Sequence, residues 1–394
     1  MNTRTDSTGN AAAAAGSEAE DTRAMLRDSL ARYLADHYGF DERRRLLEAA
    51  AQQAPLPLWR GLAQELGILG AALPESAGGM GGSMLDHLAV METLGGALAA
   101  EPYLSSAVIA GGLLERSGGE RAQALLQAIA GGEAVVAFAH DEPHSRFDAT
   151  ELRSTLARST GGWTLSGRKA VVQAAPWATQ LLVTARSAAY DDARALSLVL
   201  VDANAPGIVR RDYRTLDGGW ASELRFDDVA LPADALLGED GAAAASVERA
   251  LDEATLAVCA EAVGVMRRLM ADTADYVRQR KQFGVPIATF QVLQHRLVDM
   301  HIALEQASAL AWAAASQADA PPAQRAAAVS SAKVMTGRAC RTVGQGAVQL
   351  HGGMGMTDEL AVGHYFKRAT QIELSFGSTD QHLRRVDRLA STAA

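Results

Sequence analysis

The amino-acid sequence predicts an α+β protein, mostly α-helical, in which a β domain separates two helical domains. Apolar residues recur at helical spacing up to about Gly132 and again from about Ala243. Between these regions lie short β-type runs bounded by Gly, Pro, Asp and Asn. With 394 residues, 48% of them hydrophobic, the chain is long enough for two or three domains with a large buried core.

The N-terminal region divides into a tail and a helical domain. A run of alanines, Ala11 to Ala15, is flanked by Ser, Thr, Gly and acidic residues, without the basic start and apolar stretch of a signal peptide. We therefore expect residues 1–20 to be a disordered tail. Residues 21–132 are predicted to be helical, because Leu58, Leu62 and Leu66 and similar sets recur every four residues.

The middle and C-terminal regions differ in the secondary structure that their sequence patterns predict. Strand-like runs such as 180–184 and 196–201 predict a compact antiparallel β-barrel or sandwich over residues 133–240. The helical segments that follow are longer than the average of about 11–12 residues, which predicts a four-helix bundle over residues 241–394.

Composition excludes several classes of function. A formal charge of −9 and a pI near 5.5, without a basic block, argue against nucleic-acid binding. No apolar run of about 18 residues predicts a membrane span. Cys259 and Cys340 stand in alanine-rich helical runs, where small core filler is the expected role and a disulfide or metal ligand is not. These features favour a cytoplasmic protein with a small-molecule or protein partner and no metal.

Two motifs carry the most specific information. The first is Arg280-Lys281-Gln282-Phe283-Gly284-Val285-Pro286-Ile287, followed by Phe290-Gln291, and the second is Gln349-Leu350-His351-Gly352-Gly353-Met354-Gly355-Met356-Thr357. Taken alone, they could be a cationic helix C-terminus and a glycine C-cap. Together they resemble signatures of the acyl-CoA dehydrogenase family of flavoproteins, and the likeness runs from about residue 25 to 390. The resemblance implies FAD, an acyl-CoA substrate, an electron acceptor such as an electron-transfer flavoprotein, and a homo- or hetero-tetramer.

The resemblance also implies where FAD would bind. A guanidinium is a suitable partner for the pyrophosphate, since it stays charged and offers two parallel donors. Asp141 replaces the threonine that is usual in the family. The cofactor-binding residues implied are Phe138, His140, Asp141, Val171, Gln173, Arg280, Phe283, Gln291, Gln349, Gly352, Gly353, Ser378 and Asp380.

The usual catalytic base of the family is absent from its usual position. There the family has Glu before Gly, whereas this chain has Phe376 before Gly377, and the alternative base position holds Ala254. The remaining candidates for the base are Glu373 and Glu253, with Asp380 also nearby. The residues implied for substrate binding are Asp252, Thr255 and Gly377, although an acidic pair such as Asp252–Glu253 is more often a solvated helix face.

Three further segments resemble a bacterial subgroup, the small-subunit type of pimeloyl-CoA dehydrogenase, which works beside a large subunit. They are Glu101–Leu104, Val362–Arg368 and Phe376–Leu383. We therefore expect FAD-dependent α,β-dehydrogenation of an acyl-CoA thioester, either by this chain with a relocated base or by this chain as one subunit of a heteromer. A non-catalytic FAD-binding subunit, or a flavin oxidase or monooxygenase on the same fold, remain as alternatives.

Overall fold

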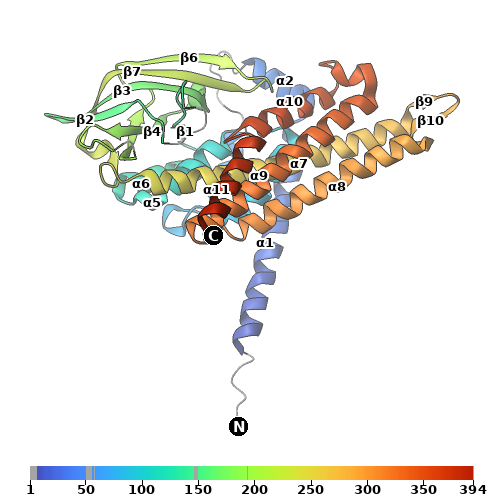
Figure 1. The fold of residues 1–394 in the computed structure, drawn as a ribbon, viewed down its shortest axis with the longest axis horizontal. Coiled ribbons are helices and arrows are strands. Elements are labelled where there is room, and N and C mark those ends of the chain that lie inside the picture. Colours follow the sequence, from blue (N-terminus) through green and yellow to red (C-terminus); the bar gives the residue numbers. More distant parts are fainter. Residues whose placement is uncertain (1–6, 50–55, 57, 146–149, 193, 394) are drawn as a thin grey trace, which may run out of the picture.

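The structure is a computed structural model, and it describes residues 7–49, 56, 58–145, 150–192 and 194–393. Two helical regions flank one β-sheet domain along the chain, as the sequence predicts, and the sheet lies at one end of the molecule (Figure 1). No helix in these ranges is long and apolar enough to cross a lipid bilayer.

The N-terminal region is helical, and α1 begins earlier than expected. Residues 7–20, expected to be a disordered tail, lie in α1, because the alanine run has high helix propensity. Ser83 caps α4: the Leu85 amide donates to Ser83 Oγ at 3.3 Å, and the Ser83 amide donates to Asp86 Oδ2 at 2.7 Å. The helices are α1 (Ser7–His37), α2 (Phe40–Ala49), α3 (Trp59–Gln64), α4 (Met84–Ala97), α5 (Gly111–Ser117) and α6 (Glu120–Ala130), with a π-helical segment at Leu104–Ala110.

The β domain is a single sheet with the strand order β6-β7-β3-β2-β4-β5-β8, and β1 also pairs with β4. Most neighbours are antiparallel, but β1 and β2 run parallel to β4, so the expectation of a purely antiparallel domain was wrong. The strands are β1 (Val136–Ala139), β2 (Thr155–Ser159), β3 (Gly162–Gln173), β4 (Gln180–Ser187), β5 (Leu196–Asp202), β6 (Ile208–Arg214), β7 (Trp220–Pro232) and β8 (Leu236–Leu237).

The parallel pairs have a simple cause. β1 pairs with residues 180–183 of β4, and β2 pairs with residues 186 and 187 further along the same edge. The two strands thus follow one another along β4, and the segment between them leaves the sheet after Ala139. That departure places His140, Asp141 and Glu142 beside the strand end.

The C-terminal region consists of long helices joined by short turns. The helices α7, α8, α9 and α10 pack together, and α11 packs on α9 as an addition to the expected four. A hairpin of β9 (Lys281–Gln282) and β10 (Val285–Pro286) projects at the far end of α7 (Figure 1). The helices are α7 (Ala244–Gln279), α8 (Gln291–Ala315), α9 (Pro322–His351), α10 (Ala361–Leu374) and α11 (Thr379–Ala393).

The helix α7 also connects the C-terminal region to the N-terminal one. At its crossing with α4 the two backbones approach closely at Gly95 and Gly264. A Cβ at Gly264 would lie only 1.9 Å from the Glu92 carbonyl oxygen, so a larger residue would push the helices apart. This contact fixes the position of α7 against α4, and α7 also packs on the π-helical segment.

Candidate functional site

A cavity of about 220 Å³, here called cavity A, lies where the β domain meets α7 and the end of α10. Its walls combine aromatic, aliphatic and a few polar side chains, as is usual for a small-molecule site. The lining residues are Ser105, Ile109, Phe138, His140, Asp141, Ala170, Val171, Gln173, Leu251, Gln371, Leu374, Ser375 and Phe376. Five residues predicted to contact the flavin, Phe138 to Asp141 and Val171 to Gln173, therefore do meet in one cavity, together with Phe376.

One wall of cavity A carries two parallel rings. Phe138 and His140 stack with their ring centroids 5.4 Å apart and an interplanar angle of 4°. His140 is buried, and burial next to Lys169 lowers its pKa to about 3, so the imidazole is neutral. The wall therefore presents two flat, uncharged rings.

The tautomer of His140 follows from its neighbours. Lys169 Nζ donates to Thr184 Oγ1 at 3.4 Å, which leaves the hydroxyl hydrogen of Thr184 for His140 Nδ1 at 2.9 Å. Because His140 Nδ1 then accepts, we assign the ring hydrogen to Nε2. This Nε2 is buried without a partner among the described residues, so it is a donor available to a bound group.

A buried ion pair supports this wall from behind. Lys169 Nζ lies 2.9 Å from Glu142 Oε1 and 2.8 Å from the His140 carbonyl oxygen. Burial disfavours the charged forms of both side chains, but Lys169 and two backbone amides that donate to Glu142 keep the pKa of its carboxyl below the ordinary value. Both charges thus persist and hold the segment after β1 against β3.

The opposite edge of cavity A is shaped by strained backbone. Val171 adopts a φ of 52° at a register shift between β3 and β7, which turns its side chain outward so that 46% of it is exposed. Gln173 follows and also lines the cavity.

The turn after α10 brings Phe376 to cavity A. Phe376 has a φ of 55°, and Gly377 has a φ of 106°. Buried Lys333 donates to the carbonyl oxygens of Ile372, Glu373 and Gly377 at 2.8, 3.0 and 3.0 Å, and His382 Nε2 donates to the Phe376 carbonyl oxygen at 2.9 Å. These bonds satisfy the free carbonyls at the helix end and fix the direction of Phe376.

The carboxylates predicted as alternative bases are bound elsewhere. Glu373 accepts from Arg341 Nη2 at 2.7 Å and from Thr379 Oγ1 at 3.0 Å, and it does not line cavity A. Glu253 is paired with Arg116 at 3.0 Å and with Arg249 at 2.9 Å. Each would have to break its ion pairs before acting as a base.

The residues predicted for substrate binding on α7 are also engaged. Asp252 is 1% exposed and accepts from Arg325 at 2.9 Å and Arg385 at 2.6 Å, while Thr255 donates to the Leu251 carbonyl oxygen. The alternative interpretation of Asp252–Glu253 as a solvated helix face was therefore wrong, because partners from distant helices bury both residues. Neither Asp252 nor Thr255 reaches cavity A, although Gly377 lies beside it.

Among the described residues that line cavity A, Asp141 is the one carboxylic acid. Asp141 is exposed to solvent, yet desolvation by the surrounding protein raises the pKa of its carboxyl. Its side chain is thus closer to neutral than that of an ordinary aspartate.

Six of the other predicted cofactor residues lie far from cavity A in the same chain. They cluster at the β9–β10 hairpin and the adjacent helix ends, at the opposite end of the molecule from the β-sheet (Figure 1). All are exposed, and Phe283 is 92% exposed. These residues are Arg280, Phe283, Gln291, Gln349, Gly352 and Gly353. Ser378 and Asp380 stand at the start of α11, where the Ser378 amide donates to Gln381.

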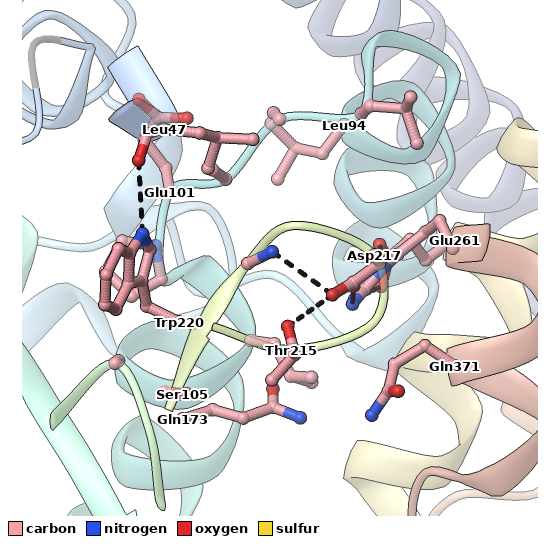
Figure 2. Close-up of a pocket in the computed structure, with 18 of the residues that line it drawn as sticks. Leu47, Leu94, Glu101, Ser105, Gln173, Thr215, Asp217, Trp220, Glu261 and Gln371 are labelled. Atoms are coloured by element: carbon pink, nitrogen blue, oxygen red, sulfur yellow. Dashed lines mark hydrogen bonds and ion pairs between the residues drawn. The ribbon is translucent and has the colours of Figure 1, made fainter. Parts of the chain in front are cut away.

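A second cavity of about 110 Å³, cavity B, lies next to cavity A and was not predicted from the sequence (Figure 2). Arg368 joins Glu261 and Asp217 in its wall, with distances of 2.6 Å to each carboxylate. Glu101 is also buried there, and burial raises its pKa to about 7. The segment containing Glu101 was noticed in the sequence, but nothing local indicated that three domains would meet at it.

Comparison with known proteins agrees with this architecture. Models of the acyl-CoA dehydrogenase N-terminal, middle and C-terminal domains match residues 20–133, 137–229 and 240–390. The chain belongs to the acyl-CoA dehydrogenase family.

Individual relatives cover most of the chain. The human mitochondrial short-chain specific acyl-CoA dehydrogenase is 29% identical over 323 residues, which is 80% of this chain and 78% of the relative. The subunit CarC of the caffeyl-CoA reductase-Etf complex of Acetobacterium woodii is 30% identical over 77% of this chain and 81% of its own length. The ChsE4-ChsE5 complex of Mycobacterium tuberculosis contains a chain with a TM-score of 0.84 and 29% identity, covering 94% of this chain and 97% of that one.

Membership makes the chain a flavoprotein oxidoreductase that uses FAD. The residues present in cavity A fit the flavin ring, since they offer a flat aromatic wall and the partnerless His140 Nε2 donor. At the other end of the chain, Gly352 and Gly353 have open space around the position of a Cβ, which leaves room for close approach of another group.

Proposed function

We propose that this acyl-CoA dehydrogenase-family protein catalyses, or helps a partner subunit to catalyse, α,β-dehydrogenation of an acyl-CoA thioester with FAD. The observation that supports this best is the division of the predicted FAD contacts into two groups at opposite ends of one chain. A single FAD does not need both groups from the same chain if a neighbouring subunit supplies one of them. FAD would take up the hydride from the substrate, while residues of cavity A orient the flavin ring and exclude water.

An exposed apolar face on α8 supports assembly. Val292, Val298 and Ile302 are 70%, 55% and 50% exposed, which is unusual for apolar side chains on one long helix. A second subunit covering this face would also bring its own residues to the exposed Arg280 end. Such an assembly agrees with the tetramer implied by the sequence.

The finer part of the proposal is that the assembly is heteromeric, as in the small-subunit type of pimeloyl-CoA dehydrogenase. Phe376 lines cavity A and stands where the sequence resemblance implies the family's base, and Glu373 and Glu253 are held in ion pairs. A paralogous subunit with the usual glutamate would then provide complete active sites. The same observations favour a second candidate function, a non-catalytic subunit that only supplies FAD contacts to its partner.

Anaerobic titration of the purified, flavin-loaded chain with medium-chain and dicarboxylyl acyl-CoA tests these functions. Bleaching of the flavin by the chain alone supports a catalytic subunit, and bleaching only with the paralogue supports the heteromer. An electron-transfer flavoprotein should then reoxidise the flavin. Rapid turnover with oxygen instead would support the oxidase or monooxygenase alternative.

A further inference from the structure

Three polar side chains line both cavities and separate them. Ser105 comes from the π-helical segment, Gln173 from the end of β3 and Gln371 from α10. Figure 2 shows the amide groups of Gln173 and Gln371 facing one another across the pocket. We call these three residues the collar.

The collar has unused hydrogen-bonding capacity. Within the part of the chain that the structure describes, none of the three side chains makes a hydrogen bond, although Ser105 is only 6% exposed. Buried polar groups normally form a hydrogen bond with the protein, with water or with a ligand. The primary amides of Gln173 and Gln371 can both donate and accept.

Cavity B behind the collar is also polar. Glu101 Oε2 and Arg43 Nη1 are buried without a partner among the described residues. The remaining charged groups of the wall, Arg368, Glu261 and Asp217, are paired with one another. A plain alkyl chain entering this region would displace water from the polar groups without replacing its hydrogen bonds.

We propose that the acyl group of the substrate passes from cavity A through the collar toward cavity B and carries a neutral hydrogen-bonding group, such as a hydroxyl or carbonyl, at this level. The proposal rests on the acyl-CoA function proposed above and defines its substrate class. A saturated acyl chain would leave the collar unsatisfied, whereas an oxygen function on the chain would bond to Gln371 or Gln173. Sites built to bond such a group discriminate strongly against analogues that lack it.

A terminal carboxylate is disfavoured by the charges of cavity B. Its wall contains three acids, Glu101, Asp217 and Glu261, against two arginines, Arg43 and Arg368. Arg368 balances only one of its two partners, Asp217 and Glu261. Above about pH 7, where Glu101 is ionised as well, the wall therefore has a net negative charge and repels another anion, because burial weakens the screening by solvent. The likeness to the pimeloyl-CoA type therefore concerns the subunit role, and we expect a different acyl chain.

Binding of matched acyl-CoA pairs tests the proposal. Calorimetric titration and the flavin absorbance change would be measured on the flavin-loaded full-length chain with hexanoyl-, octanoyl- and decanoyl-CoA and with their ω-hydroxy and ω-carboxy counterparts. At one or more lengths, the hydroxy compound should bind at least about tenfold more tightly than both the alkyl and the carboxy compound. Equal or tighter binding of the alkyl or carboxy compounds at every length would overturn the proposal while leaving the acyl-CoA function intact. Absence of binding by all compounds would count against both.

The variant Gln371→Leu locates the effect in the collar. It should lower the preference for the hydroxy compound by at least about fivefold and leave the alkyl compounds bound as well or better. Gln64→Leu, on the exposed face of α3, is the matched control and should change neither affinity. If Gln371→Leu does not fold, Gln371→Met, which is closer in shape to glutamine, is the second variant, and a preference unchanged in whichever variant folds would contradict the assignment.

Discussion

Arg368 on α10 donates two hydrogen bonds to Glu261 on α7, from Nε to Oε1 at 2.6 Å and from Nη2 to Oε2 at 2.7 Å. The same guanidinium donates from Nη1 to Asp217 Oδ2 of the β domain at 2.6 Å. Both carboxylates are buried, and Arg43 from the N-terminal region donates to the Asp217 carbonyl oxygen at 3.3 Å. One cluster thus joins all three regions of the chain beside cavity B.

Replacing Arg368 with Met should destabilise the fold strongly. It would leave Glu261 and Asp217 buried without their cation, and breaking a buried pair in this way typically costs about 3–5 kcal/mol. Urea unfolding would measure the loss. Arg278→Met is the control: its partner Asp275 is exposed, so a change within about 0.5 kcal/mol is expected. Equal effects of the two variants would show that the cluster contributes little.

The buried ion pair Lys169–Glu142 should contribute both to the stability of the fold and to the binding of flavin in cavity A. Glu142→Gln leaves the Lys169 ammonium buried without its counter-charge, so we expect a loss of about 3 kcal/mol or more and a lower flavin content. The double variant Glu142→Gln with Lys169→Met removes both charges and should recover part of that loss. This account would be contradicted if the double variant lost more free energy of unfolding than the two single variants lose together.

Arg280→Ala should release flavin without unfolding the chain. Arg280 is exposed and has no ion-pair partner among the described residues, so the free subunit loses nothing by the change. In the assembly it would remove a charge-assisted bond of about 1.5–3 kcal/mol to the pyrophosphate. The ratio of flavin to protein absorbance measures the effect, with exposed Arg60→Ala on α3 as control. Retention of flavin by the Arg280 variant would remove the main support for a shared FAD site.

Local patterns in the sequence predicted the helices well because their periodicity is a local property. Local patterns could not predict that β1 and β2 pair in parallel with β4. This pairing depends on where the chain leaves the sheet after β1. The resemblance to the family, rather than a local pattern, implied five of the residues that line cavity A, among them Phe138 and Val171. Asp252 was misjudged because its partners, Arg325 and Arg385, are 73 and 133 residues away.

Phe376→Glu tests whether cavity A retains the geometry for catalysis. The turn that carries residue 376 is fixed by Lys333 and His382, so a glutamate there should enter the cavity without moving the backbone. General-base catalysis typically contributes about 10²–10⁴-fold, and we expect the variant to gain a measurable fraction of that factor in flavin reduction by acyl-CoA. Phe376→Gln, which has a similar size and no base, is the matched control. If the wild type already reduces its flavin rapidly and the glutamate variant is slower, the base lies elsewhere, and Asp141→Asn, Glu373→Gln and Glu253→Gln should be examined next.

The pH dependence of stability should depend on Glu101. Burial raises its pKa from 4.5 to about 7, so the folded protein holds a proton that the unfolded chain releases above about pH 4.5. The folded state of the wild type is therefore penalised as the pH rises from about 4.5 to about 7, and above that range the penalty is complete. Glu101→Gln removes this titration, and its free energy of unfolding relative to the wild type should increase by about 2–4 kcal/mol between pH 4.5 and pH 8.

Urea unfolding of the wild type and of Glu101→Gln across this pH range measures the difference in their free energies of unfolding. The contributions of all other titrating groups are common to both proteins and cancel in that difference. Glu248→Gln at the exposed start of α7 is the control and should show no comparable trend. A Glu101→Gln difference that stays constant with pH would mean that the carboxylate is charged throughout, stabilised by Arg43 in the same cavity wall. Cavity B would then carry a fixed negative charge at pH 6, and its exclusion of ω-carboxy acyl-CoA should no longer weaken as the pH is lowered.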